Sequence, residues 1–154
     1  FELDMGLIEG ELNHPDLRAM HWRRDELVAF AAPDHPLAGY GALDDRALKT
    51  LPWIVREPGS GTRQTFERAM RGILPDLVIA MELQHTEAIK RAVEAGLGVG
   101  CLSRISLEDA FRRGTLVPLP IAGRDLDRDL YLITHRDKFH SALLRQWLAL
   151  CLSK

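Results

Sequence analysis

Short apolar segments alternate along this chain with segments in which apolar residues recur every three or four positions. Residues 3–8 and 27–31 are apolar runs with little helical periodicity, bounded by the turn formers Gly10 and Pro33. This pattern predicts two buried strands, and residues 17–22 between them are expected to form a further extended segment.

From residue 43 onward, the pattern predicts helices and strands in alternation. Apolar residues three and four apart in residues 62–73 are typical of a helix that packs on a sheet. We expect Ser106 to cap a later helix that Gly114 ends, and the closing helix to align Leu144, Trp147, Leu148 and Cys151 on one packed face. The expected helices cover residues 43–51, 62–73, 86–95, 107–113 and 139–152, and the expected strands cover 53–55, 77–83, 97–102, 116–119 and 130–134.

Strands that alternate with helices of this length predict an α/β fold with mostly parallel sheets and helices on both faces. In such sheets, ligands bind beyond the carboxyl ends of the strands, where the amino ends of helices point. We therefore expect the loops after Ile8, Val55 and Leu83 to lie on a common rim.

Composition narrows the possible functions. The 154 residues suit one compact domain or two small lobes, and 46% hydrophobic residues allow a buried core. A formal net charge of −2 lacks the basic excess of a nucleic-acid-binding surface. The sequence has no apolar run long enough to span a membrane and no signal sequence at its start, which predicts a cytoplasmic protein. His135 and His140 have the wrong spacing for a metal site, so we expect neither a metal nor a cofactor.

The strongest local signal is the segment Pro58-Gly-Ser-Gly-Thr62, which leads from a predicted strand into a predicted helix. Gly59 and Gly61 would let the backbone approach a ligand closely. The amides of Ser60, Gly61 and Thr62 would meet an anion with about half a positive charge from the helix dipole, and the hydroxyls of Ser60 and Thr62 could add donors. The alternative is an ordinary loop in which Ser60 or Thr62 only caps the helix.

Two further positions are candidates for the same cleft. Thr86 stands at a second junction from strand to helix, where it is either a ligand contact or a plain helix cap. Glu9 and Gly10 end the first strand, where a carboxylate could bind an amine or hydroxyl of a ligand, or form a solvated turn. Ser60 lacks the flanking pattern of a nucleophile elbow, so we do not expect an enzyme.

Several segments together resemble a known family in their order and spacing. They are Asp4-Met-Gly-Leu-Ile-Glu-Gly10, Leu27-Val-Ala-Phe-Ala-Ala-Pro-Asp-His-Pro-Leu-Ala38, Arg56-Glu-Pro-Gly-Ser-Gly-Thr-Arg63, Ala95-Gly-Leu-Gly-Val-Gly-Cys-Leu-Ser-Arg104 and Gly114-Thr-Leu-Val117. This set is similar to the effector-binding domain of LysR-type transcriptional regulators and covers nearly the whole chain.

The resemblance implies a periplasmic-binding-protein-like fold of type II, with two lobes joined by crossing strands. Residues 28–123 would form lobe II, and residues 1–27 and 124–154 would form the remainder of lobe I, with hinge crossings near 28–33 and 119–129. The effector-binding residues implied by the family pattern are Glu9, Gly10, Arg56, Glu57, Gly59, Ser60, Gly61, Thr62 and Thr86.

The resemblance also implies a function in transcription. A small anionic effector, either a carboxylate or an inorganic anion, would bind between the lobes, and a homodimer or tetramer would pass the closure to a winged helix-turn-helix. Family members carry that domain, a linker helix and the first half of lobe I ahead of the matching region. This chain is therefore expected to be truncated, to have an incomplete lobe I, and to reach DNA only through a domain outside it. The alternative is a solute-binding protein of a transport system with the same fold.

Overall fold

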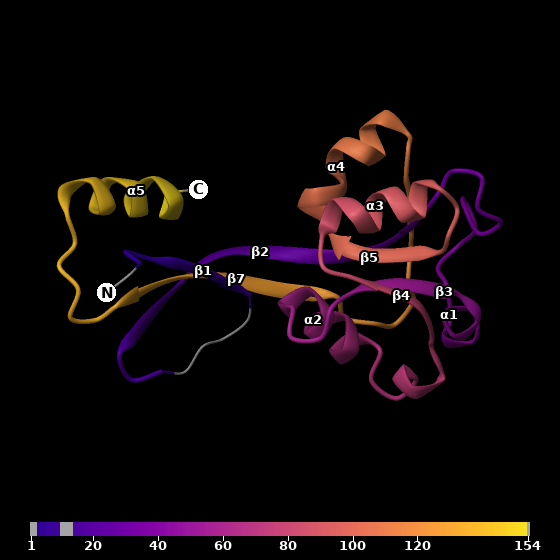
Figure 1. Ribbon diagram of the computed structural model, residues 1–154, viewed down its shortest axis with the longest axis horizontal. Coiled ribbons are helices and arrows are strands. Elements are labelled where there is room, and N and C mark those ends of the chain that lie inside the picture. The colour runs from indigo at the N-terminus through magenta and orange to yellow at the C-terminus, as the bar shows by residue number, and fades with distance from the viewer. Residues whose placement is uncertain (1–2, 10–13, 154) are drawn as a thin grey trace. The chain divides into compact units, whose positions relative to one another are not determined.

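The computed structural model describes residues 3–9 and 14–153. The chain divides into two compact units: unit 2 comprises residues 26–127, and unit 1 comprises the residues on either side of that range. Two strands, β2 (Leu17–Ala31) and β7 (Asp127–His135), carry the chain from one unit into the other (Figure 1).

Unit 1 contains β1 (Gly6–Glu9), which pairs antiparallel with β7, and the closing helix α5 (Ala142–Leu152). Leu144 and Leu148 of α5 pack on Leu132 of β7. The helix was expected to start at residue 139 and to bury Trp147. It starts instead after Ser141, whose hydroxyl accepts a hydrogen bond from the Leu144 amide, and Trp147 is 40% exposed.

Unit 2 is built on a sheet with the strand order β2-β5-β3-β4, and β6 (Val117–Leu119) pairs with β2. The strands β3 (Pro52–Arg56), β4 (Val78–Leu83) and β5 (Val99–Ser103) run parallel, whereas β2 runs antiparallel to β5 and β6. The α/β class is confirmed, but the sheet is mixed rather than mostly parallel, because the chain enters unit 2 along β2 in the opposite direction.

Helices cover both faces of this sheet, as predicted (Figure 1). Alternate strand residues point to opposite faces: Trp53 and Val55 join a core with α1 (Asp45–Thr50) and α2 (Gly61–Ala69), while Ile54 joins a second core with α3 (Thr86–Glu94) and α4 (Arg104–Arg113). Leu48 and Phe66 complete the first core.

Three local predictions were wrong in detail. The two extended segments expected at residues 17–22 and 27–31 form the single strand β2. The helix expected over residues 62–73 ends at Ala69, with Met70 as its C-cap. A turn that contains Gly72 at a positive φ of 91° and a short 3-10 turn (Leu74–Asp76) follow. Ser106 lies inside α4, where its hydroxyl donates to the Ser103 carbonyl at 2.7 Å, so it does not cap the helix.

Candidate functional site

The turn between β3 and α2 has the predicted strand-turn-helix geometry. Gly59 takes a positive φ of 91°, which an L residue adopts only with strain. Ser60 is extended at the N-cap position, with φ −66° and ψ 136°, and the helix begins at Gly61. The glycine thus reverses the chain directly after the sheet and lets α2 start at its edge.

Ser60 caps α2 through its side chain. Its hydroxyl oxygen accepts a hydrogen bond from the Arg63 amide at 3.4 Å, and its own amide donates to the Glu57 carbonyl at 3.3 Å. The expectation that the Ser60 amide is exposed for an anion is therefore wrong, because the turn itself uses this donor. Among the described residues, the Gly61 amide has no acceptor, which leaves it as the backbone donor at the amino end of α2.

Thr62 lies on the covered side of α2. It is only 5% exposed and shares the buried face of the helix with Thr65 and Phe66. Its hydroxyl is therefore not a surface group of unit 2.

Charged side chains around the turn are paired with one another. Arg56 and Glu57 form a two-pronged ion pair, with 2.8 Å between Nε and Oε2 and 2.9 Å between Nη2 and Oε1. The hydrogen bonds from Arg56 hold the pKa of the Glu57 carboxyl below its ordinary value, so this carboxylate stays ionised at neutral pH.

Arg63 ties the turn to the helix, a role that the sequence did not reveal. Its side chain is 11% exposed, and it donates from Nη1 to the Arg56 carbonyl at 3.0 Å and from Nε to Glu67 Oε1 at 2.6 Å. The spacing of four residues between Arg63 and Glu67 is a signal that could have found the second contact.

Thr86 is the first residue of α3, and the N-cap is His85, which makes no side-chain capping bond. The interpretation of Thr86 as a plain cap is therefore wrong. Because β3 and β4 are parallel neighbours, the helices that follow them, α2 and α3, begin at the same edge of the unit 2 sheet. This agrees with the common rim expected for the loops after Val55 and Leu83.

Glu9 belongs to unit 1 and is neither a free carboxylate nor part of a solvated turn. Its Oε2 lies 2.6 Å from Nη1 of Arg128, and Arg128 also donates through Nε to Oδ2 of Asp25 at 2.8 Å. Asp25 and Arg128 are 5% and 7% exposed, so this is a buried ion-pair network. Gly10, the remaining candidate, lies outside the described residues.

Across residues 3–9 and 14–153, no three His, Cys, Asp or Glu side chains gather as metal ligands would. The helices of the same residues are all too short or too polar to cross a membrane.

Comparison with known proteins identifies the family. The model of the LysR substrate binding domain matches residues 1–154. The chain belongs to this family. The expected resemblance is thus confirmed, and with it a ligand-binding domain of transcriptional regulators rather than an enzyme.

Sequence identity to an individual relative supports this family assignment. The chain is 44% identical over 151 residues to the uncharacterized HTH-type transcriptional regulator YeiE of Escherichia coli strain K12, covering 98% of this chain and 51% of YeiE. The LysR domain described here therefore spans about half the length of this curated relative.

Solved structures give the same result for the fold. The regulatory domain of Synechocystis PCC6803 CcmR in complex with 2-PG matches with a TM-score of 0.87 and 30% identity, over 99% of this chain and 73% of that one. The effector binding domain of QuiR in complex with shikimate matches with a TM-score of 0.83 and 22% identity, over 99% of this chain and 71% of that one. The fold is thus the type II periplasmic-binding-like fold of LysR effector-binding domains.

Proposed function

We propose that this LysR domain senses a small anion, a carboxylate or an inorganic anion, at the amino end of α2. The observation that carries the proposal is the Gly61 amide, which has no acceptor among the described residues and stands at a helix start with about half a positive charge behind it. Gly59, with its positive φ, holds the turn that presents this amide.

The other predicted contacts of unit 2 lie at the same sheet edge. The Arg56–Glu57 pair borders the turn, and Thr86 begins the helix that starts at the same sheet edge. Shikimate, which is bound to the domain of QuiR, is a carboxylate, and this supports a small carboxylate as one form of the effector.

We further propose that units 1 and 2 correspond to lobes I and II, with hinge crossings near residues 28–33 and 119–129. A ligand that binds the closed arrangement more tightly shifts the population toward it. A homodimer or tetramer in the cytoplasm would pass that change to a winged helix-turn-helix on the whole regulator, so that DNA is bound by a domain outside these 154 residues.

The test is a thermal-unfolding titration with phosphate, sulfate, acetate and shikimate at constant ionic strength. An anion at one hundred times its dissociation constant should add about 2.7 kcal/mol to the free energy of unfolding. For a chain of this size, that corresponds to a rise of about 8 °C in the melting temperature.

Gly61→Pro is the decisive variant, because it removes only the amide donor. Proline is favoured at the first position of a helix, and the extended backbone of Ser60 is compatible with a following proline. Losing one hydrogen bond to a charged ligand should weaken anion binding about ten- to a hundredfold. Ala142→Pro makes the same change after Ser141 at the start of α5 and should leave binding intact. Equal anion affinity in Gly61→Pro and the unmodified protein would refute the site.

A further inference from the structure

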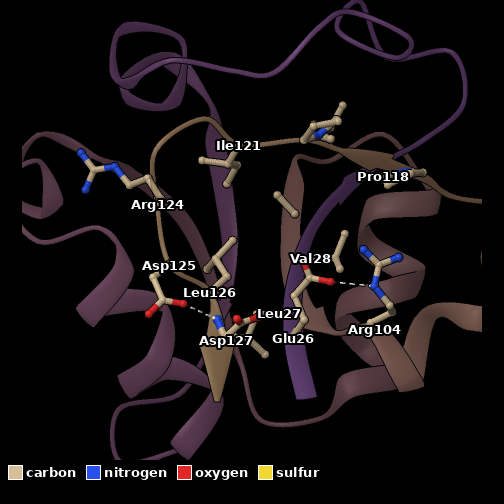
Figure 2. A pocket seen from close by; sticks show the side chains of 13 residues that line it. Glu26, Leu27, Val28, Arg104, Pro118, Ile121, Arg124, Asp125, Leu126 and Asp127 are labelled. Atoms are coloured by element: carbon tan, nitrogen blue, oxygen red, sulfur yellow. Dashed lines mark hydrogen bonds and ion pairs between the residues drawn. The ribbon is translucent and has the colours of Figure 1, made fainter. Parts of the chain in front are cut away.

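Unit 2 contains a pocket of about 470 Å³ that the proposed anion site does not use. It is lined by β2 from Glu26 to Ala29, by Arg104 of α4, and by residues between Pro118 and Asp127 (Figure 2). Its volume is within the usual range of about 300 to 1,000 Å³ for small-molecule sites.

The backbone explains why the pocket exists. β6 pairs with β2 as far as Leu119, which lies opposite Ala29. The chain then leaves β2 and is held aside by Leu43, whose amide donates to the Pro120 carbonyl at 2.8 Å. It returns at Leu126, whose carbonyl accepts from the Leu27 amide at 2.9 Å. The pocket lies where this segment departs from the strand and comes back.

The pocket has an apolar wall between two charged ends. Pro118, Pro120 and Ile121 line the pocket with apolar atoms that are exposed or partly exposed, above the buried side chains of Leu27 and Leu119. Figure 2 shows Arg104 on one side of β2 and Asp125 on the other, with Leu27 and Val28 between them. A ligand that fills the pocket would therefore meet a cation at one end and a carboxylate at the other.

The guanidinium group of Arg104 is oriented to bind a carboxylate. Its Nε donates to Glu26 Oε2 at 2.8 Å, which fixes the guanidinium plane, and its two Nη groups have no acceptor among the described residues. The side chain is 49% exposed. Arg104 is also the first residue of α4, so the helix dipole adds positive potential there. Paired guanidinium donors of this kind bind carboxylates in a fixed orientation.

Asp125 provides the opposite charge. Its Oδ1 accepts from the Asp127 amide at 2.9 Å, which holds the carboxylate in place. The neighbouring Arg124 does not neutralise it, because the Arg124 guanidinium pairs with Asp45 and with the Ala69 carbonyl. Asp127 also lines the pocket.

We propose that this pocket binds a small zwitterion, an amino acid whose carboxylate rests on the Nη groups of Arg104 and whose ammonium faces Asp125. The aliphatic part of the ligand would contact the apolar atoms of Pro118, Pro120 and Ile121. Since Glu26 and Asp127 are the first and last residues of unit 2, such a ligand contacts both segments that join this unit to the rest of the chain. The site is independent of the anion site at α2.

The test is isothermal titration calorimetry of the protein with glycine, β-alanine, γ-aminobutyrate and ε-aminocaproate, which differ in the distance between their charges. Butyrate and butylammonium carry only one charge each and serve as controls. At least one amino acid should bind about tenfold or more tightly than either control, because two charged hydrogen-bonding ends act together. No binding by any amino acid, or equal binding by a singly charged control, overturns the proposal.

Variants assign the two ends. Arg104→Gln and Asp125→Asn should each weaken amino-acid binding about tenfold. The asparagine oxygen can still accept from the Asp127 amide, so the turn is kept. Arg112→Gln and Asp109→Asn break an exposed ion pair on the same helix and should leave binding unchanged. If they weaken it as much as the pocket variants do, the pocket is not the site. Gly61→Pro should not affect this binding, which separates the result from that of the anion titration.

Discussion

Replacing Asp25 by asparagine would leave Arg128 as a buried cation that has lost its more deeply buried counterion. The side chains of Asp25 and Arg128 are 1% and 5% exposed, and Oδ2 of Asp25 accepts from both Nε and Nη2 of Arg128 at 2.8 Å. Breaking such a pair costs about 3 to 5 kcal/mol, because the remaining charge stays desolvated. Glu9 keeps a 2.6 Å contact with Arg128, so we expect about 3 kcal/mol for Asp25→Asn alone.

Urea denaturation followed by circular dichroism measures this difference. Adding Glu9→Gln to Asp25→Asn removes the second carboxylate and should raise the loss toward about 5 kcal/mol. Asp129→Asn is the matched control, because Asp129 lies next to Arg128 in β7. Its partner is His21, the two side chains are 50% and 55% exposed, and such pairs contribute about 1 kcal/mol or less.

A double variant that removes both charges separates the cost of a buried unpaired charge from the cost of lost contacts. Asp25→Leu together with Arg128→Met replaces both charges by apolar groups, and it should be more stable than Asp25→Asn because no fully buried ion is left unpaired. The carboxylate that loses its partner, Glu9, has a 35% exposed side chain and is solvated. A loss below about 1 kcal/mol for Asp25→Asn, equal to that of Asp129→Asn, would refute the reasoning that burial makes this pair costly to break.

Three further predictions concern unit 2. Gly100→Ala should lower the urea midpoint by an amount equivalent to about 1 to 3 kcal/mol, since the new Cβ would lie 2.4 Å from Cζ of Phe30. Gly114→Ala should cost about 1 kcal/mol in the same assay, because Gly114 ends α4 at φ 69°. Glu57→Gln should tighten sulfate binding about threefold or more at neutral pH, measured by calorimetry, because it removes a negative charge next to the turn. Because the folded-state pKa of Glu57 is lowered, its stabilising contribution should be present above the ordinary glutamate pKa and be lost as the pH falls through the lowered value, and this pH dependence should be absent in Glu57→Gln.

The elements of unit 2 could be predicted because their apolar periods are unambiguous. Strand β3 and helices α2 and α3 lie within a few residues of their expected bounds. The glycine-rich segment before Cys101 serves packing, since Gly100 leaves room for the Phe30 ring and a Cβ on Gly98 would lie 2.3 Å from the Pro52 carbonyl.

Strand β2 could not be predicted as one element, because its middle is a run of charged residues that looks like a turn. Asp25 is buried there only because Arg128 reaches it from more than one hundred residues further along the chain. Glu9 was misjudged for the same reason, since its partner is again Arg128. Local patterns contain no information about a counterion so distant in sequence.

The turn at α2 shows where sequence reasoning is strong and where it fails. The positive φ of Gly59 and the cap at Ser60 follow from residue type, and both could be predicted. The spacing of Arg63 and Glu67 could have predicted their pairing, whereas the two-pronged pairing of Arg56 with Glu57 could be seen only in the structure. These pairs change the chemistry of the site, because two arginines that would attract an anion are already opposed by carboxylates.

Since the side-chain charges at this turn cancel in pairs, the net attraction for an anion comes from the Gly61 amide and the dipole of α2. A helix dipole acts mainly within its first turn, so an anion must come into direct contact with the amide to gain from it. Such a site selects for a small, exposed oxygen anion and discriminates poorly among the groups attached to it. The distinction between one effector and another must then depend on side chains that surround the rest of the ligand, so the site proposed at this turn specifies a charge for the effector and no carbon skeleton.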